Sequence, residues 1–144
     1  MNVVVLHGPN LNLLGNREPE IYGHLSLAQI DRRIADRAAE LGIAVHIRQS
    51  NLEGELVTEV QRARGWAAGI VINPAGYSHT SVAIRDAVAA VGLPTIEVHL
   101  SNPAGREDFR RTDLVAGACT GMITGLGWRG YLLALEALLA ISAP

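Results

Sequence analysis

Short apolar runs alternate with helix-like segments along this chain, and this alternation restricts the fold more than any other feature of the sequence. Runs with strand character cover residues 3–6, 44–47, 69–72, 95–100 and 118–124. Helical periodicity and capping signals cover residues 26–41, 53–64, 80–90 and 128–141. Strands that alternate with helices in this way are typical of a parallel sheet with helices on both faces.

Local signals support these boundaries. Ser26 and Gln29 have the spacing of a capping box, and Gly42 follows the last apolar position of the same helix. Residues 69–72 are apolar throughout, which indicates a strand buried on both faces. A length of 144 residues favours one domain. We therefore predict a single α/β domain over residues 1–144 with a flavodoxin-like, doubly wound, five-stranded parallel sheet in the order 2-1-3-4-5.

The connection after the first predicted strand is much longer than the roughly 2–6 residues that usually join a strand to a helix. It runs from His7 to His24 and contains three asparagines, an arginine and a tyrosine, interleaved with leucines and an isoleucine. A long polar segment in this position, with apolar residues to anchor it, is typical of an active-site lid. We predict such a lid at about residues 15–24.

Composition and charge exclude several kinds of partner. The formal net charge is −2, so the basic footprint of a nucleic-acid-binding protein is missing. No apolar run approaches the roughly 20 residues of a membrane span, and no secretory signal is expected. The single cysteine, Cys119, fits a reducing cytoplasm. Charged residues make up only 18% of the chain, which favours extra surface buried in a homo-oligomer.

The chain has no lysine, because all 12 of its basic residues are arginine. Schiff-base chemistry and attachment of pyridoxal phosphate both need a lysine amine, and a phosphate-binding P-loop needs Gly-Lys-Ser/Thr. The five histidines show no metal-ligand spacing such as H-E-x-x-H. We therefore expect a reaction without cofactor or metal.

Polar residues gather where the first, third and fourth predicted strands end, at residues 7–10, 73–79 and 97–102. The carboxyl ends of parallel strands meet at one edge of a sheet, and ligands of doubly wound folds bind there. The three segments are rich in asparagine, histidine and serine within an otherwise apolar chain. They predict a polar pocket that the segment at 15–24 would cover.

Several motifs extend this pattern over nearly the whole chain: GPNLNLLG at 8–15, REP at 17–19, YG at 22–23, QSN at 49–51, NP at 73–74, HTS at 79–81, RDA at 85–87, EVHLSN at 97–102, REDFR at 106–110, GLG at 125–127 and GY at 130–131. In this order they resemble the type II 3-dehydroquinate dehydratase family. The sequence departs from the family pattern at residues 75–78, where Ala-Gly-Tyr-Ser replaces the expected Gly-Ala-Tyr-Thr.

The resemblance implies a hydro-lyase that converts 3-dehydroquinate reversibly to 3-dehydroshikimate in the shikimate or quinate pathway. It implies anti elimination through an enolate, no cofactor or metal, and a homododecamer built as a tetramer of trimers. The chemistry needs a base for the proton beside the ketone, stabilisation of the developing enolate, and an acid for the leaving hydroxide. Tyrosine beside arginine, and histidine near a carboxylate, can supply these roles.

The resemblance also implies individual roles. Tyr22 is the base, and Arg17 stabilises its phenolate. His99 is the acid, and Glu97 lies on the same side of a strand, where it would orient the imidazole and favour its charged form. Asn10 holds the water or side chain that stabilises the enolate. Substrate contacts are expected from Asn73, His79, Leu100, Ser101, Arg106 and Arg110, and from Asp86 in the site of a neighbouring subunit.

Two other functions are compatible with this fold class. A flavin- or mononucleotide-binding module needs a phosphate-binding loop of serine, threonine and glycine after the first strand, whereas residues 10–14 read Asn-Leu-Asn-Leu-Leu. A phospho-receiver domain needs an acidic cluster at the end of that strand and a lysine late in the chain, and the sequence has neither.

Overall fold

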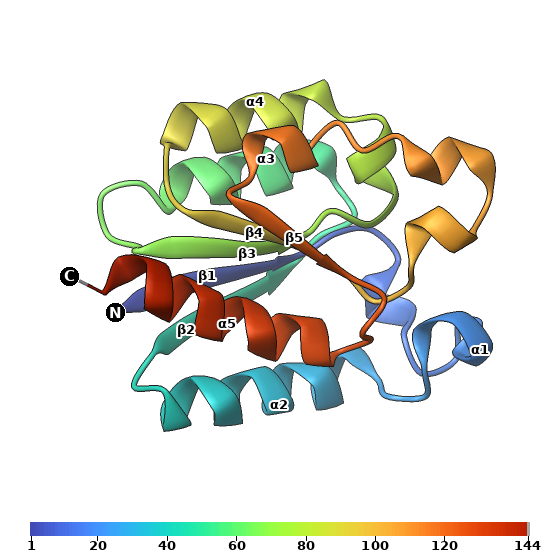
Figure 1. The fold of residues 1–144 in the computed structure, drawn as a ribbon, viewed down its shortest axis with the longest axis horizontal. Helices are drawn as coiled ribbons and strands as arrows, with labels where there is room; N and C mark the ends of the chain where they lie inside the picture. The colour runs from blue at the N-terminus through green and yellow to red at the C-terminus, as the bar shows by residue number, and fades with distance from the viewer. Residues whose placement is uncertain (144) are drawn as a thin grey trace.

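The computed structural model describes residues 1–143, which form a five-stranded parallel sheet in the order β2-β1-β3-β4-β5 (Figure 1). The strands are β1 (Asn2–His7), β2 (Ala44–Gln49), β3 (Gly69–Asn73), β4 (Thr95–His99) and β5 (Gly121–Thr124). The predicted strand order and fold class are therefore confirmed. The first strand lies inside the sheet, between β2 and β3, and β4 lies between β3 and β5.

Helices cover both faces of the sheet, with α2 and α5 on one side and α3 and α4 on the other (Figure 1). The helices are α1 (Pro19–Tyr22), α2 (Leu27–Glu40), α3 (Glu53–Arg62), α4 (Val82–Val91) and α5 (Arg129–Ser142). Short 3-10 turns cover Leu11–Leu13, Ala75–His79, Pro103–Gly105, Asp108–Arg111 and Ala116–Ala118. No helix within residues 1–143 has the length and apolar character needed to cross a membrane.

Two apolar layers hold the helices to the sheet, and alternate residues of β1 divide between them. Val3 and Val5 pack with α2 and α5, whereas Val4 and Leu6 pack with α3 and α4. Successive side chains of a strand point to opposite faces, so one apolar strand serves both layers. This is why the central strands of a doubly wound sheet are apolar throughout.

Side-chain caps mark the starts of α2 and α4. The Ser26 hydroxyl accepts the Gln29 N–H at 3.2 Å, and Gln29 Oε1 accepts the Ser26 N–H at 2.9 Å, so the predicted capping box is present. Ser81 caps α4, because its hydroxyl accepts the Ile84 N–H at 2.9 Å. These caps fix where the connections from β1 and β3 end.

The fifth strand is shorter than predicted. Residues 118–124 were expected to be extended, but β5 begins only at Gly121 and Ala118 ends a 3-10 turn. Ala118 and Cys119 are apolar because they pack against the layer under α3 and α4, not because they belong to the sheet. The segment that precedes β5 is therefore a loop, and it ends beside the start of β4, where the Thr120 N–H bonds the Thr95 carbonyl at 2.7 Å.

Candidate active site

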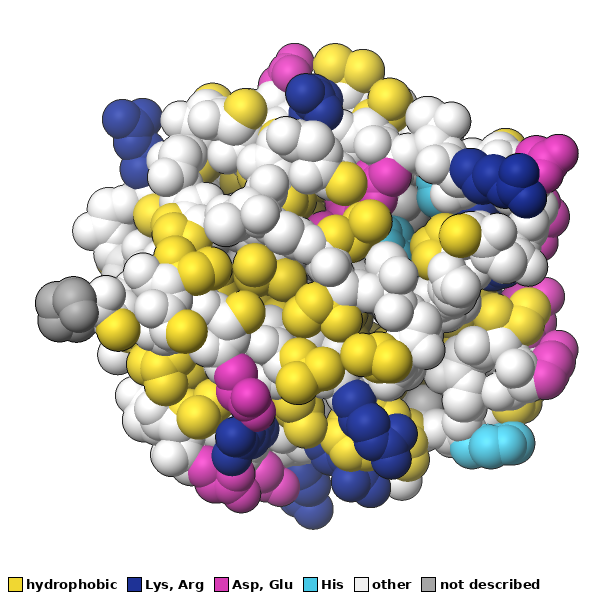
Figure 2. All heavy atoms as spheres, in the orientation of Figure 1, with side chains coloured by type: hydrophobic (Ala, Val, Ile, Leu, Met, Phe, Trp, Pro, Cys, Tyr) yellow, Lys and Arg dark blue, Asp and Glu magenta, His cyan; other side chains and the backbone are white. Residues whose placement is uncertain are grey.

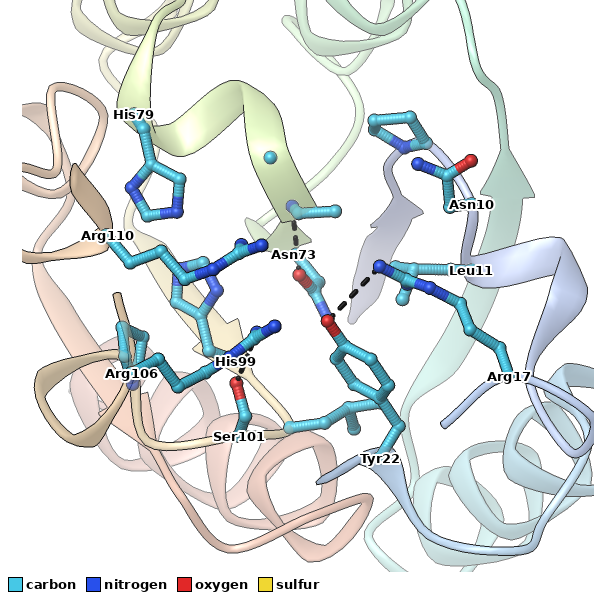
Figure 3. Close-up of a pocket in the computed structure, with 15 residues that line it drawn as sticks. Asn10, Leu11, Arg17, Tyr22, Asn73, His79, His99, Ser101, Arg106 and Arg110 are labelled. Atoms are coloured by element: carbon cyan, nitrogen blue, oxygen red, sulfur yellow. Dashed lines mark hydrogen bonds between the residues drawn. The ribbon is translucent and has the colours of Figure 1, made fainter. Parts of the chain in front are cut away.

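A cavity of about 140 Å³ lies at the carboxyl ends of β1, β3 and β4 (Figure 3). Its lining residues come from the loop after β1, the segment at 15–24, the turn after β3 and the loop after β4: Pro9, Asn10, Leu11, Arg17, Tyr22, Asn73, Ala75, Gly76, His79, His99, Leu100, Ser101, Pro103, Arg106 and Arg110. Pockets for drug-sized ligands have volumes of roughly 300–1,000 Å³. This cavity suits a small polar molecule better than a flavin or a dinucleotide.

The cavity brings together ten of the residues predicted from the sequence: Asn10, Arg17, Tyr22, Asn73, His79, His99, Leu100, Ser101, Arg106 and Arg110. Glu97 does not line it but contacts His99 from within the protein. Asp86 lies away from the cavity, on the exposed side of α4. Within one chain, Asp86 is thus the predicted site residue that the fold leaves apart from the others.

Tyr22 and Arg17 form one wall of the cavity. Arg17 Nη2 donates a hydrogen bond to the Tyr22 hydroxyl at 3.1 Å, and its Cζ lies 4.3 Å from the centre of the ring (Figure 3). The Cζ of Arg106 lies 5.3 Å from the same ring. Cations in these positions stabilise negative charge on a phenol oxygen. This wall therefore places a phenol oxygen beside a guanidinium group.

His99 forms the opposing wall at the end of β4. Its Nε2 lies 2.9 Å from Glu97 Oε2, as expected for residues two apart on one strand. Nε2 also lies 3.5 Å from Asp113 Oδ2, a contact that the sequence did not predict. Since Nε2 faces these carboxylates, Nδ1 is the ring nitrogen that remains for a ligand.

The environment of His99 favours its charged form. Burial alone would lower the pKa of His99, but hydrogen bonds to Asp113 and Glu97 outweigh it and raise that pKa to about 9. Burial raises the pKa of Glu97 to about 7, against the hydrogen bond from His99. Burial also acts to raise the pKa of Asp113, but its hydrogen bonds to His99 and Glu97 hold it well below the usual range. At neutral pH the imidazolium can therefore act as an acid.

Asp113 is the main residue of this site that the sequence reasoning missed. It lies in the loop between the Asp108–Arg111 turn and β5, and belongs to none of the motifs. An aspartate before a turn signals capping of nearby N–H groups. Its Oδ1 does accept the N–H groups of Val115 and Ala116, at 3.0 and 2.9 Å. That signal could have predicted the cap, but not the contact with His99.

A buried hydrogen-bond network, also missed, holds Asn73 in place. Asn73 Nδ2 donates to the Tyr131 hydroxyl at 3.1 Å, and Asn73 Oδ1 accepts the Ala75 N–H at 3.0 Å. The Tyr131 hydroxyl lies 2.8 Å from His7 Nδ1, and His7 Nε2 lies 2.8 Å from Asp31. Burial raises the pKa of Tyr131, so its hydroxyl stays protonated and donates to His7. The network fixes which way the Asn73 amide faces the cavity.

The cavity lining also contains many hydrogen-bond donors. His79 Nδ1 donates to the Thr112 carbonyl at 2.7 Å, which leaves Nε2 for a ligand. Arg106 Nη1 donates to Ser101 Oγ at 3.3 Å, while its buried Nε has no partner within residues 1–143. Arg110 is held by Glu107. Donors of this kind bind hydroxyl groups and carboxylates.

Backbone strain is concentrated at this site. Three non-glycine residues within 1–143 have positive φ: Asn10 (68°), Glu18 (36°) and Ala75 (52°). Asn10 and Ala75 line the cavity, and Glu18 follows Arg17. Ala75 stands where the resemblance led us to expect glycine, and its left-handed conformation carries a cost for alanine. Such strain is typical of functional sites.

One group of side chains could in principle hold a metal ion. Ligand atoms of Glu97, His99 and Asp113 lie within 4.8 Å of one another. A metal ion would need the lone pair of Nε2, whereas this nitrogen is placed to donate a proton to Glu97. Chemistry without a metal therefore remains a prediction of the sequence and can be tested directly.

A donor-rich cavity at the carboxyl ends of a 2-1-3-4-5 parallel sheet defines a flavodoxin-like α/β protein with a small-molecule site. A family model described as Dehydroquinase class II matches residues 1–139 of the chain. The chain is therefore a member of that family.

Named relatives agree. The chain is 58% identical over 135 residues to a 3-dehydroquinate dehydratase of Phenylobacterium zucineum, covering 94% of this chain and 93% of the relative. It is 52% identical over 142 residues to that of Pelotomaculum thermopropionicum, covering 99% of both. The crystal structure of a type II dehydroquinase from Butyrivibrio crossotus matches with a TM-score of 0.94 at 42% identity, covering 96% of this chain and 97% of that one.

Proposed function

We propose that this protein dehydrates 3-dehydroquinate reversibly to 3-dehydroshikimate, by anti elimination through an enolate, as a hydro-lyase of the shikimate or quinate pathway. Family membership supports the reaction. The observation that carries the mechanism is the cavity itself, where Tyr22 beside a cation and His99 beside two carboxylates line opposite walls. A base on one side and an acid on the other is the arrangement that an anti elimination needs.

Each wall has a separate step in this mechanism. The Tyr22 phenolate, stabilised by Arg17, removes the proton beside the ketone and leaves an enolate. Asn10, directly or through a bound water, stabilises the enolate oxygen. The His99 imidazolium then gives its proton to the departing hydroxide, which leaves as water. Glu97 orients the imidazole from behind.

The remaining donors bind the substrate. Arg106, Arg110, Ser101 and the backbone of Leu100 lie on the same side of the cavity and would hold the carboxylate and a ring hydroxyl. Asn73 and His79 would bind further hydroxyl groups from the turn after β3. The segment at 15–24 would close over the bound ring as a lid and bring Tyr22 to it.

The test is an ultraviolet assay for the conjugated enone produced from 3-dehydroquinate. The purified protein should form the enone, and it should remain fully active after treatment with a chelator and after borohydride in the presence of substrate. Loss of activity with the chelator would indicate a metal, and loss with borohydride would indicate an imine. Either loss would contradict the proposed chemistry.

We further propose that the protein acts as a homo-oligomer in the cytoplasm, as a tetramer of trimers in which Asp86 reaches a neighbouring site. Apolar side chains are exposed on β5 and α5, including Met122, Leu126 and Leu133, and Figure 2 shows this face with few charged groups. Surfaces of this kind usually bind another protein surface. Sedimentation at micromolar concentration should give a species of twelve chains, and a fully active monomer would refute the shared site.

A further inference from the structure

The side of the cavity that His99 forms, called the acid wall below, contains one more carboxylate than the proposed mechanism uses. A histidine oriented by one glutamate would suffice, yet Nε2 of His99 faces both Glu97 and Asp113. The two carboxylates have different surroundings. Which of them is charged at neutral pH decides how His99 is kept protonated.

Glu97 is poorly equipped to carry the negative charge. Its side chain is fully buried, and its Oε1 has no hydrogen-bond partner within residues 1–143. A buried carboxylate without donors on both oxygens is costly to ionise. The pKa of Glu97, raised to about 7 by burial, agrees with this geometry. Glu97 is therefore the harder of the two carboxyl groups to ionise.

Asp113 has the surroundings of a stable anion. Its Oδ1 accepts two backbone N–H groups, from Val115 and Ala116, and its side chain is 16% exposed. Backbone donors directed at a carboxylate favour its ionised form. The same two hydrogen bonds hold Oδ2 in position, 3.5 Å from His99 Nε2. The carboxylate best suited to stay ionised beside His99 is thus anchored to the loop, while the nearer carboxyl group, that of Glu97 at 2.9 Å, lies on the strand.

We propose that Asp113 is a positioning residue for His99, whose anchored carboxylate keeps the imidazole charged and turned so that Nδ1 faces the cavity. Glu97 then orients the ring from the strand. This inference rests on the proposed role of His99 as the acid. It assigns the stabilisation of the charged imidazole to Asp113, a residue outside every motif of the sequence.

The other titratable groups near this cluster do not replace Asp113. The thiol of Cys119 packs near the loop, and burial, then Glu97 and Asp113, raise its pKa to about 12, so it stays neutral. Arg106, Arg110 and His79 line the same cavity as His99. Arginines there oppose the charge on His99, so they make the anion behind it more necessary.

The experiment is a proton NMR titration of the imidazole of His99, assigned by the signal lost in His99→Gln. Wild type should titrate well above the ordinary value of about 6.5. Asp113→Asn keeps the side-chain shape and an oxygen for the two N–H groups, but removes the charge. It should lower the midpoint by about 1 pH unit or more, because a neighbouring opposite charge shifts a pKa by 1–3 units. Glu97→Gln should lower it by less.

The alkaline limit of turnover should move with the same midpoint. The acid form of His99 is present below its pKa and is lost as the pH rises through it, so Asp113→Asn should lose activity first at high pH. The matched control is Asp108→Asn, an aspartate of the same loop whose side chain is 93% exposed. It should change neither the His99 midpoint nor the pH profile.

Several outcomes would overturn the inference. A wild-type His99 that titrates near 6.5 would do so, as would a midpoint that is unchanged in Asp113→Asn or that falls further in Glu97→Gln. If Asp113→Asn does not fold, Asp113→Ser retains a hydroxyl that can accept a loop N–H, and the same shift is expected. The titration needs no substrate. If the protein were inactive on 3-dehydroquinate, the proposed function would be refuted. The titration of His99 would still decide the role of Asp113.

Discussion

The two walls of the cavity are built in different ways. His99 and Glu97 lie on β4, inside the sheet, and are almost completely buried. Tyr22 and Arg17 lie on the segment at 15–24, where the four-residue helix α1 begins after Glu18 in a strained conformation. The sheet thus positions the acid before any ligand arrives, whereas the base lies on a segment whose short helix, α1, has no buried residue. Such segments open at low free-energy cost, which suits a wall that must admit substrate.

The largest effect is expected from removing the base. Tyr22→Phe keeps the ring that packs against the core and removes only the hydroxyl. General base catalysis contributes roughly 10²–10⁴-fold, so turnover should fall by at least that factor while the fold survives. The measurement is kcat together with the circular dichroism spectrum.

A matched control is available for this change. Tyr77→Phe also removes one phenolic hydroxyl, which bonds the Asn51 carbonyl at 2.7 Å outside the cavity lining. It should lose far less activity than Tyr22→Phe. A folded Tyr22→Phe variant with more than about a tenth of wild-type turnover would place the base elsewhere in the cavity.

Removing the cation beside the base should have the next largest effect. Arg17→Ala deletes the 3.1 Å hydrogen bond to Tyr22 and should lower kcat about 10- to 100-fold, the effect of one nearby charge on an ionisation. In the double variant the two losses should not add, because Arg17 acts through the same phenolate. Arg33→Ala, at a surface arginine over Trp128, is the control. Fully additive losses would mean that Arg17 has a separate role, such as binding substrate.

The smallest effect concerns the strained turn after β3. Ala75→Gly relieves a left-handed residue, which costs about 1 kcal/mol for alanine, but adds roughly 0.4–1 kcal/mol of unfolded-state entropy. The free energy of unfolding should therefore stay the same or rise slightly. Ala89→Gly, on an exposed helical position of α4, should lower it by about 1 kcal/mol. Equal losses in urea unfolding would show that Ala75 is not strained.

The His99–Glu97 side of the cavity, which lies on β4, was far more predictable from the sequence than the contacts that these residues make with distant segments. Apolar periodicity and capping residues predicted the alternating strands and helices, and the strand order followed as the commonest arrangement of such a pattern. Two-residue spacing predicted the Glu97–His99 pair. Local patterns carry this information because strands and caps obey fixed geometry. Contacts between distant segments have no such pattern. Asp113 reaches His99 only because the loop before β5 folds back over β4.

The network behind Asn73 escaped prediction for the same reason. Tyr131 on α5 and His7 at the end of β1 meet across 124 positions of sequence. Taken alone, Tyr131 has the pattern of an ordinary core residue and His7 that of an ordinary residue at a strand end. The prediction for the start of β5 was wrong for a different reason. The apolar residues 118–119 pack against the core and do not belong to the sheet. Apolar character by itself does not distinguish these two uses.

The central claim is that the two walls perform separate steps, and exchange of the substrate's α-proton with solvent tests it most directly. His99→Ala should retain this exchange in deuterated water while dehydration becomes slow, because the Tyr22 wall still forms the enolate. Tyr22→Phe should lose exchange and dehydration together. If His99→Ala lost exchange in proportion to turnover, or if Tyr22→Phe still exchanged the proton at the wild-type rate, the division of labour between the loop and the sheet would be contradicted.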